Sequence, residues 1–504
     1  MSQSVENKRG RIRKPIAPEL VRYVNDPIAK SDYETSYFTY LTVNRAHVLM
    51  LEKQGIISKD ICRAILAATH EIEAHPIAPD FTKDTGIEDL YSTLERRLIS
   101  MVGLETGGQQ HTARSRNDLG ATVVRMDTRE PYLKLCGLFN KLRRTLLEVA
   151  AKNTGTVLSG YTHMQPSEPI TFAHYLSGVL SGIERDYRRF EAAWQSLNLC
   201  PLGGCSMGST SFDIDRRMTA ELLGFDAPNA NSIDTVASRD FALEIATTLA
   251  IAANTLSRLA FDLYIWATPE YGYVEVDDSC AVCSSIMPQK KNAFTLEHVK
   301  AKAGHMHRYA MAMLACTKNI IYSHSKDTSV ETTKNLRALM QEMECDLVLI
   351  ELTVRTLGVK PDVMLDHAKR NFCTVTELAN YLVRHDGMSF RQAHEVVAGV
   401  VANMVDRALT CAEIDRAAVN EVAQSAFGIT TSLSDEIVRE ALDPVRIAEA
   451  KSTMGGCAHA EVEHQLAMIR EALEKDEATL EARCRGIADA QAKLDAMTDA
   501  AIAG

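Results

Sequence analysis

The feature that most restricts the fold is a set of very long segments in which apolar residues recur at helical spacing. They cover residues 117–153, 170–197, 238–268 and 332–359. Several are apolar on more than one face, so one small domain cannot bury them. They predict an all-α protein with a long central helix bundle that other subunits extend. Pro131 is expected to bend the first helix or to lie near its start.

Two breaks in this pattern divide the chain into three expected domains. The glycine-rich stretch Gly103–Gln110 ends an N-terminal helical domain, residues 1–110. A turn-like stretch, Gly358–Asp362, begins a C-terminal helical domain, residues 361–504. The central domain, residues 111–360, contains all the long helical patterns.

Charge and hydropathy exclude several classes of function. The net charge of −11 argues against general nucleic-acid binding. The longest apolar stretch, residues 241–267, is interrupted by Glu244, Arg258 and Asp262, so we expect a buried helix and no membrane span. No secretory-type apolar run follows the basic N-terminal residues, and we expect no signal peptide.

The cysteines indicate a reducing compartment. The twelve cysteines are scattered singly, without the spacing of a disulfide framework. Cys280 and Cys283 have the spacing of zinc ligands, but the sequence offers no second pair to complete a tetrahedral site. We therefore expect a cytoplasmic protein without a metal.

One segment with unusual chemistry is "HTARSRND", His111–Asp118, between the glycine-rich turn and a long helix. Ser115, Arg116 and Asn117 would place a guanidinium, two neutral donors and backbone N–H groups at a helix N-terminus, which suits an anion. The alternative is a helix cap beside a solvated arginine.

A second segment is "GYTHMQPSEPI", Gly160–Ile170, where Thr162 and His163 stand between a glycine and two prolines. This composition predicts a turn, and a histidine there can transfer protons near neutral pH. A purely structural histidine is the alternative.

The third segment is "CSSIMPQKKNAF", Cys283–Phe294, which resembles neither helix nor strand. The cations Lys290 and Lys291 would favour the alkoxide form of a nearby serine. The alternative is a flexible surface loop.

One reaction would use all three segments. Removing a proton beside a carboxylate builds an enediolate, which needs cations and N–H donors. Expelling an amine from the adjacent carbon then needs an acid. The substrate expected from these parts is a small anion of the substituted-succinate class.

The motifs in these segments resemble those of the fumarase/aspartase superfamily. "SSIMPQKKN" resembles its signature loop, while "HTARSRND", "GYTHMQ", "EPITFAHYL" and "PLGGCSMGSTSFDIDRRMTAELLGFD" are similar to argininosuccinate lyase. The likeness extends from about residue 46 to residue 364 and is weaker beyond. It implies a three-domain, all-α homotetramer with a multi-helix core, active sites shared between three subunits, and no cofactor.

The resemblance also assigns roles in proton removal. Ser284 matches the general base, with Ser285 beside it. Lys290 and Asn292 match groups that hold the carboxylate undergoing enolisation. His163 matches the histidine implicated in proton transfer, and Glu297 matches the carboxylate paired with that histidine.

Substrate contacts follow from the same motifs. Ser115, Arg116, Asn117 and Thr162 match residues that bind the substrate carboxylates. The segment that holds the amine portion departs from the family pattern "YNKDLQEDK". Aligning Lys326-Asp327 with its Lys-Asp places His324 at the tyrosine, Ser329 at the glutamine and Thr332 at the lysine.

These residues predict a carbon–nitrogen lyase that eliminates fumarate reversibly from an N-substituted L-aspartate. The changed amine segment leaves alternatives open, because lost polar partners change which leaving group is accepted. They are a true argininosuccinate lyase, a lyase of ethylenediamine-disuccinate compounds, a carbon–sulfur lyase of S-succinated thiols, and an inactive crystallin-like homologue.

Overall fold

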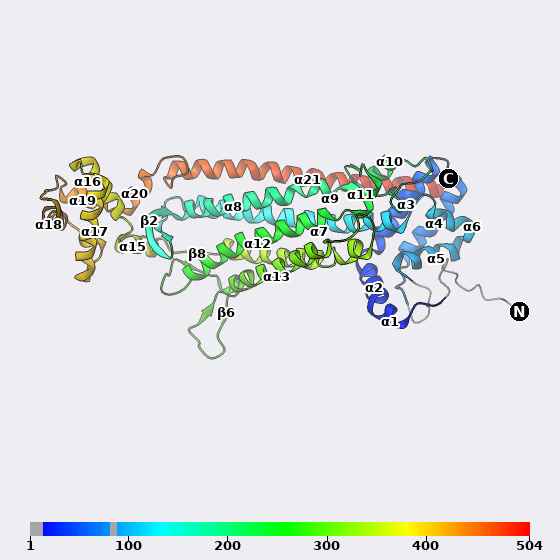
Figure 1. Ribbon diagram of the computed structural model, residues 1–504, viewed down its shortest axis with the longest axis horizontal. Coiled ribbons are helices and arrows are strands. Elements are labelled where there is room, and N and C mark those ends of the chain that lie inside the picture. Colours follow the sequence, from blue (N-terminus) through cyan, green and yellow to red (C-terminus); the bar gives the residue numbers. More distant parts are fainter. Residues whose placement is uncertain (1–13, 81–87) are drawn as a thin grey trace.

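The computed structural model describes residues 14–80 and 88–504. Helices dominate it, and the described strands form four separate two-stranded sheets (Figure 1). The predicted all-α class is therefore confirmed. The basic N-terminal stretch "RGRIRKP", residues 9–15, lies largely outside the described residues.

The centre of the molecule is a bundle of long helices that lie side by side (Figure 1). Its members are α7 (Arg116–Ala151), α8 (Phe172–Ala192), α12 (Asp240–Trp266), α13 (Phe294–Cys316) and α14 (Leu336–Arg355). The helix α7 continues past Pro131, which therefore lies in its interior. None of the described helices is long and apolar enough to cross a membrane.

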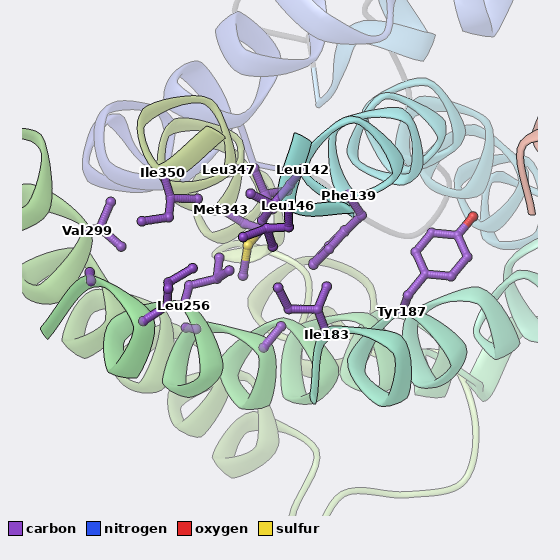
Figure 2. Packing of buried hydrophobic residues seen from close by; sticks show 14 of the residues in the cluster. Phe139, Leu142, Leu146, Ile183, Tyr187, Leu256, Val299, Met343, Leu347 and Ile350 are labelled. Atoms are coloured by element: carbon purple, nitrogen blue, oxygen red, sulfur yellow. The ribbon is translucent and has the colours of Figure 1, made fainter. Parts of the chain in front are cut away.

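The bundle is held together by one continuous apolar core. Figure 2 shows Leu146 of α7, Ile183 of α8, Leu256 of α12, Val299 of α13 and Met343 of α14 pointing into it. Each of these side chains is at most 1% exposed. A fully buried aliphatic side chain contributes about 1.5–3 kcal/mol, so this core supplies much of the folding free energy.

Short helices form the N-terminal domain and the region after the bundle. The first group is α1 (Pro18–Leu20), α2 (Asp26–Thr35), α3 (Tyr37–Lys53), α4 (Lys59–Ala74), α5 (Leu90–Val102) and α6 (Leu104–Gly107). The second is α15 (Pro361–Arg370), α16 (Val375–Asp386), α17 (Phe390–Asp406), α18 (Arg416–Phe427), α19 (Asp435–Ala441) and α20 (Pro444–Ala450). Each group encloses an apolar core of its own.

The last helix, α21 (His459–Ala503), returns along the whole bundle (Figure 1). Leu466 and Leu473 pack in the bundle core, whereas Leu494 packs in the N-terminal core. The sequence pattern grouped these residues with a C-terminal domain, residues 361–504. Their packing instead joins α21 to the other two parts of the chain.

A buried ion pair ties three of the long helices together. Arg143 of α7 is fully buried and donates to Glu184 of α8, with an Nη2–Oε2 distance of 2.7 Å. It also pairs with Asp476 of α21 at 2.8 Å. Its guanidinium lies over the ring of Tyr187. Removing one partner would leave an uncompensated buried charge, which costs about 3–5 kcal/mol.

Asp346 of α14 is a buried carboxyl group with neither oxygen hydrogen-bonded to a described residue. Burial raises its pKa to about 8, although Lys302 opposes the shift. The folded protein therefore keeps this proton up to about pH 8, whereas the unfolded chain loses it near pH 4. Stability must fall as the pH rises through this window.

Replacement of Asp346 by asparagine tests this assignment. Asp346→Asn removes the cost of ionising the buried carboxyl, so we expect a higher melting temperature at pH 8, by ~2 °C or more. The gain should shrink towards pH 5. Calorimetry at both pH values measures it, with the exposed Asp499→Asn as control. An equal shift at both pH values would show that ionisation is not the cause.

Candidate active site

The segment His111–Asp118, here called the anion segment, lies at the N-terminus of α7. Ser115 caps the helix: its Oγ accepts from the Asn117 N–H at 3.2 Å. The helix cap that was the alternative to an anion site is therefore present. Arg116 is not simply solvated, because its Nη1 donates to Glu88 and Asp89, each at 2.9 Å. Two carboxylates thus hold this guanidinium beside the helix end.

Asp118 organises this region, and sequence reasoning gave it no role. It is fully buried, and Oδ1 accepts from the N–H groups of Ser115 and Leu119, both at 3.0 Å. Oδ2 accepts from the N–H groups of Gly203 and Cys205, both at 2.9 Å. The sequence contains a signal for this role, because an acidic residue three positions after a serine is the pattern of a capping box.

The segment of residues 203–209, here called the glycine loop, is therefore attached to α7. A second bond strengthens the connection, since Asn117 Nδ2 donates to the Ser206 carbonyl at 3.1 Å. Burial raises the pKa of Asp118, and its bonds to backbone N–H groups oppose that shift. A carboxylate with four N–H donors fixes two backbone segments against each other.

The segment between α13 and α14, which contains the aligned residues His324 to Thr332 and is here called the amine segment, also contacts the glycine loop. It connects α13 to α14 and contains a single π-type turn, Asp327–Glu331. Tyr322 donates to Asp234 at 2.6 Å, and the Ser323 hydroxyl lies 3.9 Å from the Met207 sulfur in the glycine loop. The segment with His324 and Ser329 therefore lies beside the anion segment within one chain.

His163 lies on the predicted turn. The strand β1 (Val157–Thr162) pairs antiparallel with β2 (Gln165–Thr171), and Thr162 faces Gln165 across the turn. His163 and Met164 have φ angles of 53° and 60°, as the two central residues of a tight hairpin require. Thr162 and His163 are exposed to solvent in the single chain.

The signature segment folds as a projecting hairpin (Figure 1). Its short strands β6 (Val282–Cys283) and β7 (Lys291–Asn292) pair, which corrects the expectation of a segment without strands. The Ser284 Oγ accepts from Met287 N at 3.0 Å, and Ser284 N donates to the Lys290 carbonyl. Ser285 is exposed, and Asn292 is half-buried.

The two lysines of this hairpin differ in their surroundings. Lys291 forms ion pairs with Asp278 at 2.7 Å and with Glu275 at 3.4 Å. Lys290 is exposed and pairs with no carboxylate of the described residues. Of the two, only Lys290 is therefore without an ion pair among the described residues. Glu297, exposed in the first turn of α13, accepts from Tyr264 and does not contact His163 within this chain.

One chain cannot bring all these groups together. The helix α7 has 36 residues and spans roughly 54 Å. Ser115 precedes its first residue, whereas His163 follows its last turn. The twelve residues from 152 to 163 extend at most about 43 Å and cannot return that distance. A site that contains both residues must therefore draw them from different chains.

Comparisons with known proteins agree with the motifs. Residues 29–307 match the family model described as Lyase, and residues 372–449 match Argininosuccinate lyase C-terminal. The chain is 43% identical to argininosuccinate lyase 1 of Shouchella clausii, over 93% of this chain and 94% of that protein. The chain belongs to the argininosuccinate lyase family. Argininosuccinate lyase of Methanosarcina acetivorans is 36% identical over 93% of this chain and 94% of that protein.

Two solved structures have the same fold as this chain. An EDDS lyase in complex with formate superposes with a TM-score of 0.87 at 29% identity, covering 97% of each chain. An EDDS lyase variant with bound fumarate gives 0.86 at 30% identity, over 97% of this chain and 96% of that one. The chain is thus an argininosuccinate-lyase-like, fumarate-releasing carbon–nitrogen lyase.

The position of Asp118 gives a testable consequence. Asp118→Asn replaces one acceptor oxygen with an NH₂ group, so two backbone N–H groups lose their partner. Each unsatisfied group costs about 1–3 kcal/mol. We expect a lower melting temperature and a KM for the substrate raised roughly tenfold, because Asn117 and the glycine loop separate.

Steady-state kinetics and thermal unfolding measure both effects. Asp213→Asn, an exposed carboxylate shortly after the glycine loop, is the control. If Asp118→Asn left KM and melting temperature unchanged, the carboxylate would have no organising role.

Proposed function

We propose that this enzyme eliminates fumarate from an N-substituted L-aspartate and that the reaction is reversible. The observation that carries the proposal is the shared attachment of the anion segment and the amine segment to the glycine loop. Each chain thus contributes one part of the active site, here called a half-site. In it the anion segment binds a carboxylate and the neighbouring amine segment binds the leaving group. The remaining groups, on the turn and the projecting hairpin, would come from other chains.

The projecting hairpin supplies the groups that remove the proton. Ser284 takes the proton from the carbon beside a carboxylate, while Lys290 and Asn292 stabilise the negative charge that develops on that carboxylate. Ser285 lies next to the base and contacts the same group. Helix-terminal N–H groups suit anions, so Ser115, Arg116 and Asn117 bind the succinyl portion, together with Thr162.

Bond cleavage completes the elimination. The electron pair of the broken C–H bond forms the new carbon–carbon double bond, and the C–N bond breaks. His163, oriented by Glu297, protonates the departing amine. His324 and Ser329 contact that amine portion. These steps need no cofactor and no metal, and the described residues contain no cluster of ligands that could hold a metal ion.

Self-association would complete the site. Exposed apolar side chains follow the outer faces of three bundle helices: Ile251 and Phe261 on α12, Met311 and Leu314 on α13, and Val348 on α14. Such a surface suits burial against further copies of the chain. We propose a homotetramer in the cytoplasm, with neither nucleic acid nor membrane as a partner.

Two other substrates have specific support. The curated relatives named above are argininosuccinate lyases, which favours argininosuccinate. The EDDS lyase structures favour an ethylenediamine-disuccinate-type compound, and a carbon–sulfur substrate would use the same succinyl site. Assays of fumarate release from each compound distinguish these substrates.

Ser284→Ala tests the proposed base. We expect the rate of fumarate release to fall by about 10²–10⁴-fold with an unchanged melting temperature, since general-base catalysis contributes about that much. Fumarate absorbance in the ultraviolet measures the rate, with a panel of N-succinyl amines and argininosuccinate. The exposed Ser100→Ala is the control. Full activity in Ser284→Ala would remove this serine from the mechanism.

Mixed assemblies test the sharing of sites. Asn117→Ala and His163→Ala should each be inactive as homogeneous assemblies. Co-expressed chains should regain activity, because some mixed sites receive Asn117 from a His163→Ala chain and His163 from an Asn117→Ala chain. Activity measurements on tagged, co-purified assemblies check this. Without recovery in a confirmed mixture, both residues would have to act from the same chain.

A further inference from the structure

The position of the His163 imidazole depends on the strands beneath it. His163 is exposed at the tip of the hairpin formed by β1 and β2, and its side chain forms no hydrogen bond or ion pair within residues 14–80 and 88–504. The base of this hairpin contacts the C-terminal part of the chain, at α15 and α20. The contacts at the base therefore decide where the imidazole lies.

Two side chains from the C-terminal part converge on β2. Lys451 Nζ donates to the carbonyl of Pro169 at 3.2 Å and forms an ion pair with the carboxylate of Glu168. The thiol of Cys457 lies 3.8 Å from the same carbonyl oxygen. Pro169 is buried, and a buried carbonyl group needs a hydrogen-bond donor. Lys451 is the stronger of the two donors, because a thiol is a weak one.

The backbone of residues 451–458, here called the clamp loop, brings these two side chains together. It turns back on itself, since the Ala458 N–H donates to the Lys451 carbonyl at 3.2 Å. Gly456 is required at this turn, because a Cβ atom there would lie 2.0 Å from the Lys451 carbonyl oxygen. Gly455 has a φ angle of 81°, in the left-handed region that favours glycine. The double glycine thus places Lys451 beside Cys457.

A β-bulge lies between the base of the hairpin and its tip. The register shifts between Ser159 and Tyr161. A Cβ atom at the intervening Gly160 would lie only 3.0 Å from the Glu168 carbonyl oxygen. A bulge bends its strand and changes the direction of the residues beyond it. Glu168 stands opposite the bulge, so Lys451 holds the hairpin where the direction of its tip is set.

Bonds to β1 keep the hairpin folded without Lys451. The Ser159 hydroxyl accepts from Asn371 Nδ2 at 2.7 Å. The hydroxyl of Tyr161 lies 3.1 Å from that of Tyr273. These contacts hold β1, whereas the clamp loop holds β2. Loss of the Lys451 contacts should therefore loosen β2 and the tip and leave the hairpin in place.

We propose that Lys451 is a positioning residue for His163, and this role rests on the function proposed above. In that function His163 protonates the departing amine, so its imidazole must come within about 3 Å of the nitrogen. A misplacement of about 1 Å can lower the rate roughly 10²-fold. The side chains of Lys451 and Glu168 are 29% and 49% exposed. Such an ion pair contributes only about 0–1 kcal/mol to stability, so it acts mainly on the geometry of the hairpin.

Lys451→Met removes the ammonium group and keeps the apolar stem. We expect kcat for fumarate release to fall about tenfold, with KM within about twofold, because His163 acts on the leaving nitrogen in the transition state. Lys451→Arg retains donors for Glu168 and Pro169 and should restore most of kcat. The control is Lys475→Met, which breaks an exposed ion pair with Glu471 on α21. An unchanged kcat in Lys451→Met would overturn the proposal.

The basicity of the leaving group separates a loss of positioning from general damage. An acid matters most when a strongly basic alkylamine departs, and little when a weakly basic arylamine departs. The ratio of the wild-type rate to the Lys451→Met rate should be about tenfold for N-butyl-L-aspartate and below about threefold for N-phenyl-L-aspartate. Equal ratios for the two compounds would overturn the proposal. Fumarate release from either compound by the wild type would support the lyase function.

Hydrogen exchange tests the positioning without turnover. Amide exchange across residues 157–171 is compared by mass spectrometry in the intact wild type, Lys451→Met and Lys475→Met. We expect exchange to become about threefold faster or more in Lys451→Met alone, since local opening becomes easier. Faster exchange would support the proposal even if no compound released fumarate and the lyase function failed. Equal exchange in all three proteins would overturn it.

Discussion

The rigid length of α7 is the constraint on which the rest of this structure depends. A continuous helix of 36 residues holds the anion segment at one end and leads to the histidine turn at the other. Apolar packing and the buried Arg143–Glu184 pair hold it within the bundle. Ser115 and His163 are thereby kept apart within one chain.

Within each half-site, backbone segments are positioned by a few buried polar side chains. Asp118 binds four N–H groups from two segments that are distant in the sequence. Arg116 is held by Glu88 and Asp89, immediately before the first residue of α5. The backbone around the N-terminus of α7 is thus fixed by buried hydrogen bonds, whereas the segment between α13 and α14 retains buried polar atoms without a partner among the described residues.

Periodicity and turn chemistry were sufficient to predict the helical class, the long bundle, the cap at Ser115 and the turn at His163. These features depend on local spacing, which a sequence displays directly. Long-range contacts were not predictable in that way. The four donors to Asp118, the return of α21 and the neutralisation of Lys291 by Asp278 all join residues whose proximity only the tertiary fold creates.

The path of α21 also sets an order for folding. Leu494 and the partly buried Met497 and Ile502 belong to the core of the N-terminal domain, whose other residues emerge from the ribosome hundreds of positions earlier. That core stays incomplete until almost the whole polypeptide has been made. Until α21 has been synthesised, the apolar surface that Leu494 covers stays exposed, and exposed apolar surface of this kind makes a nascent chain prone to aggregate.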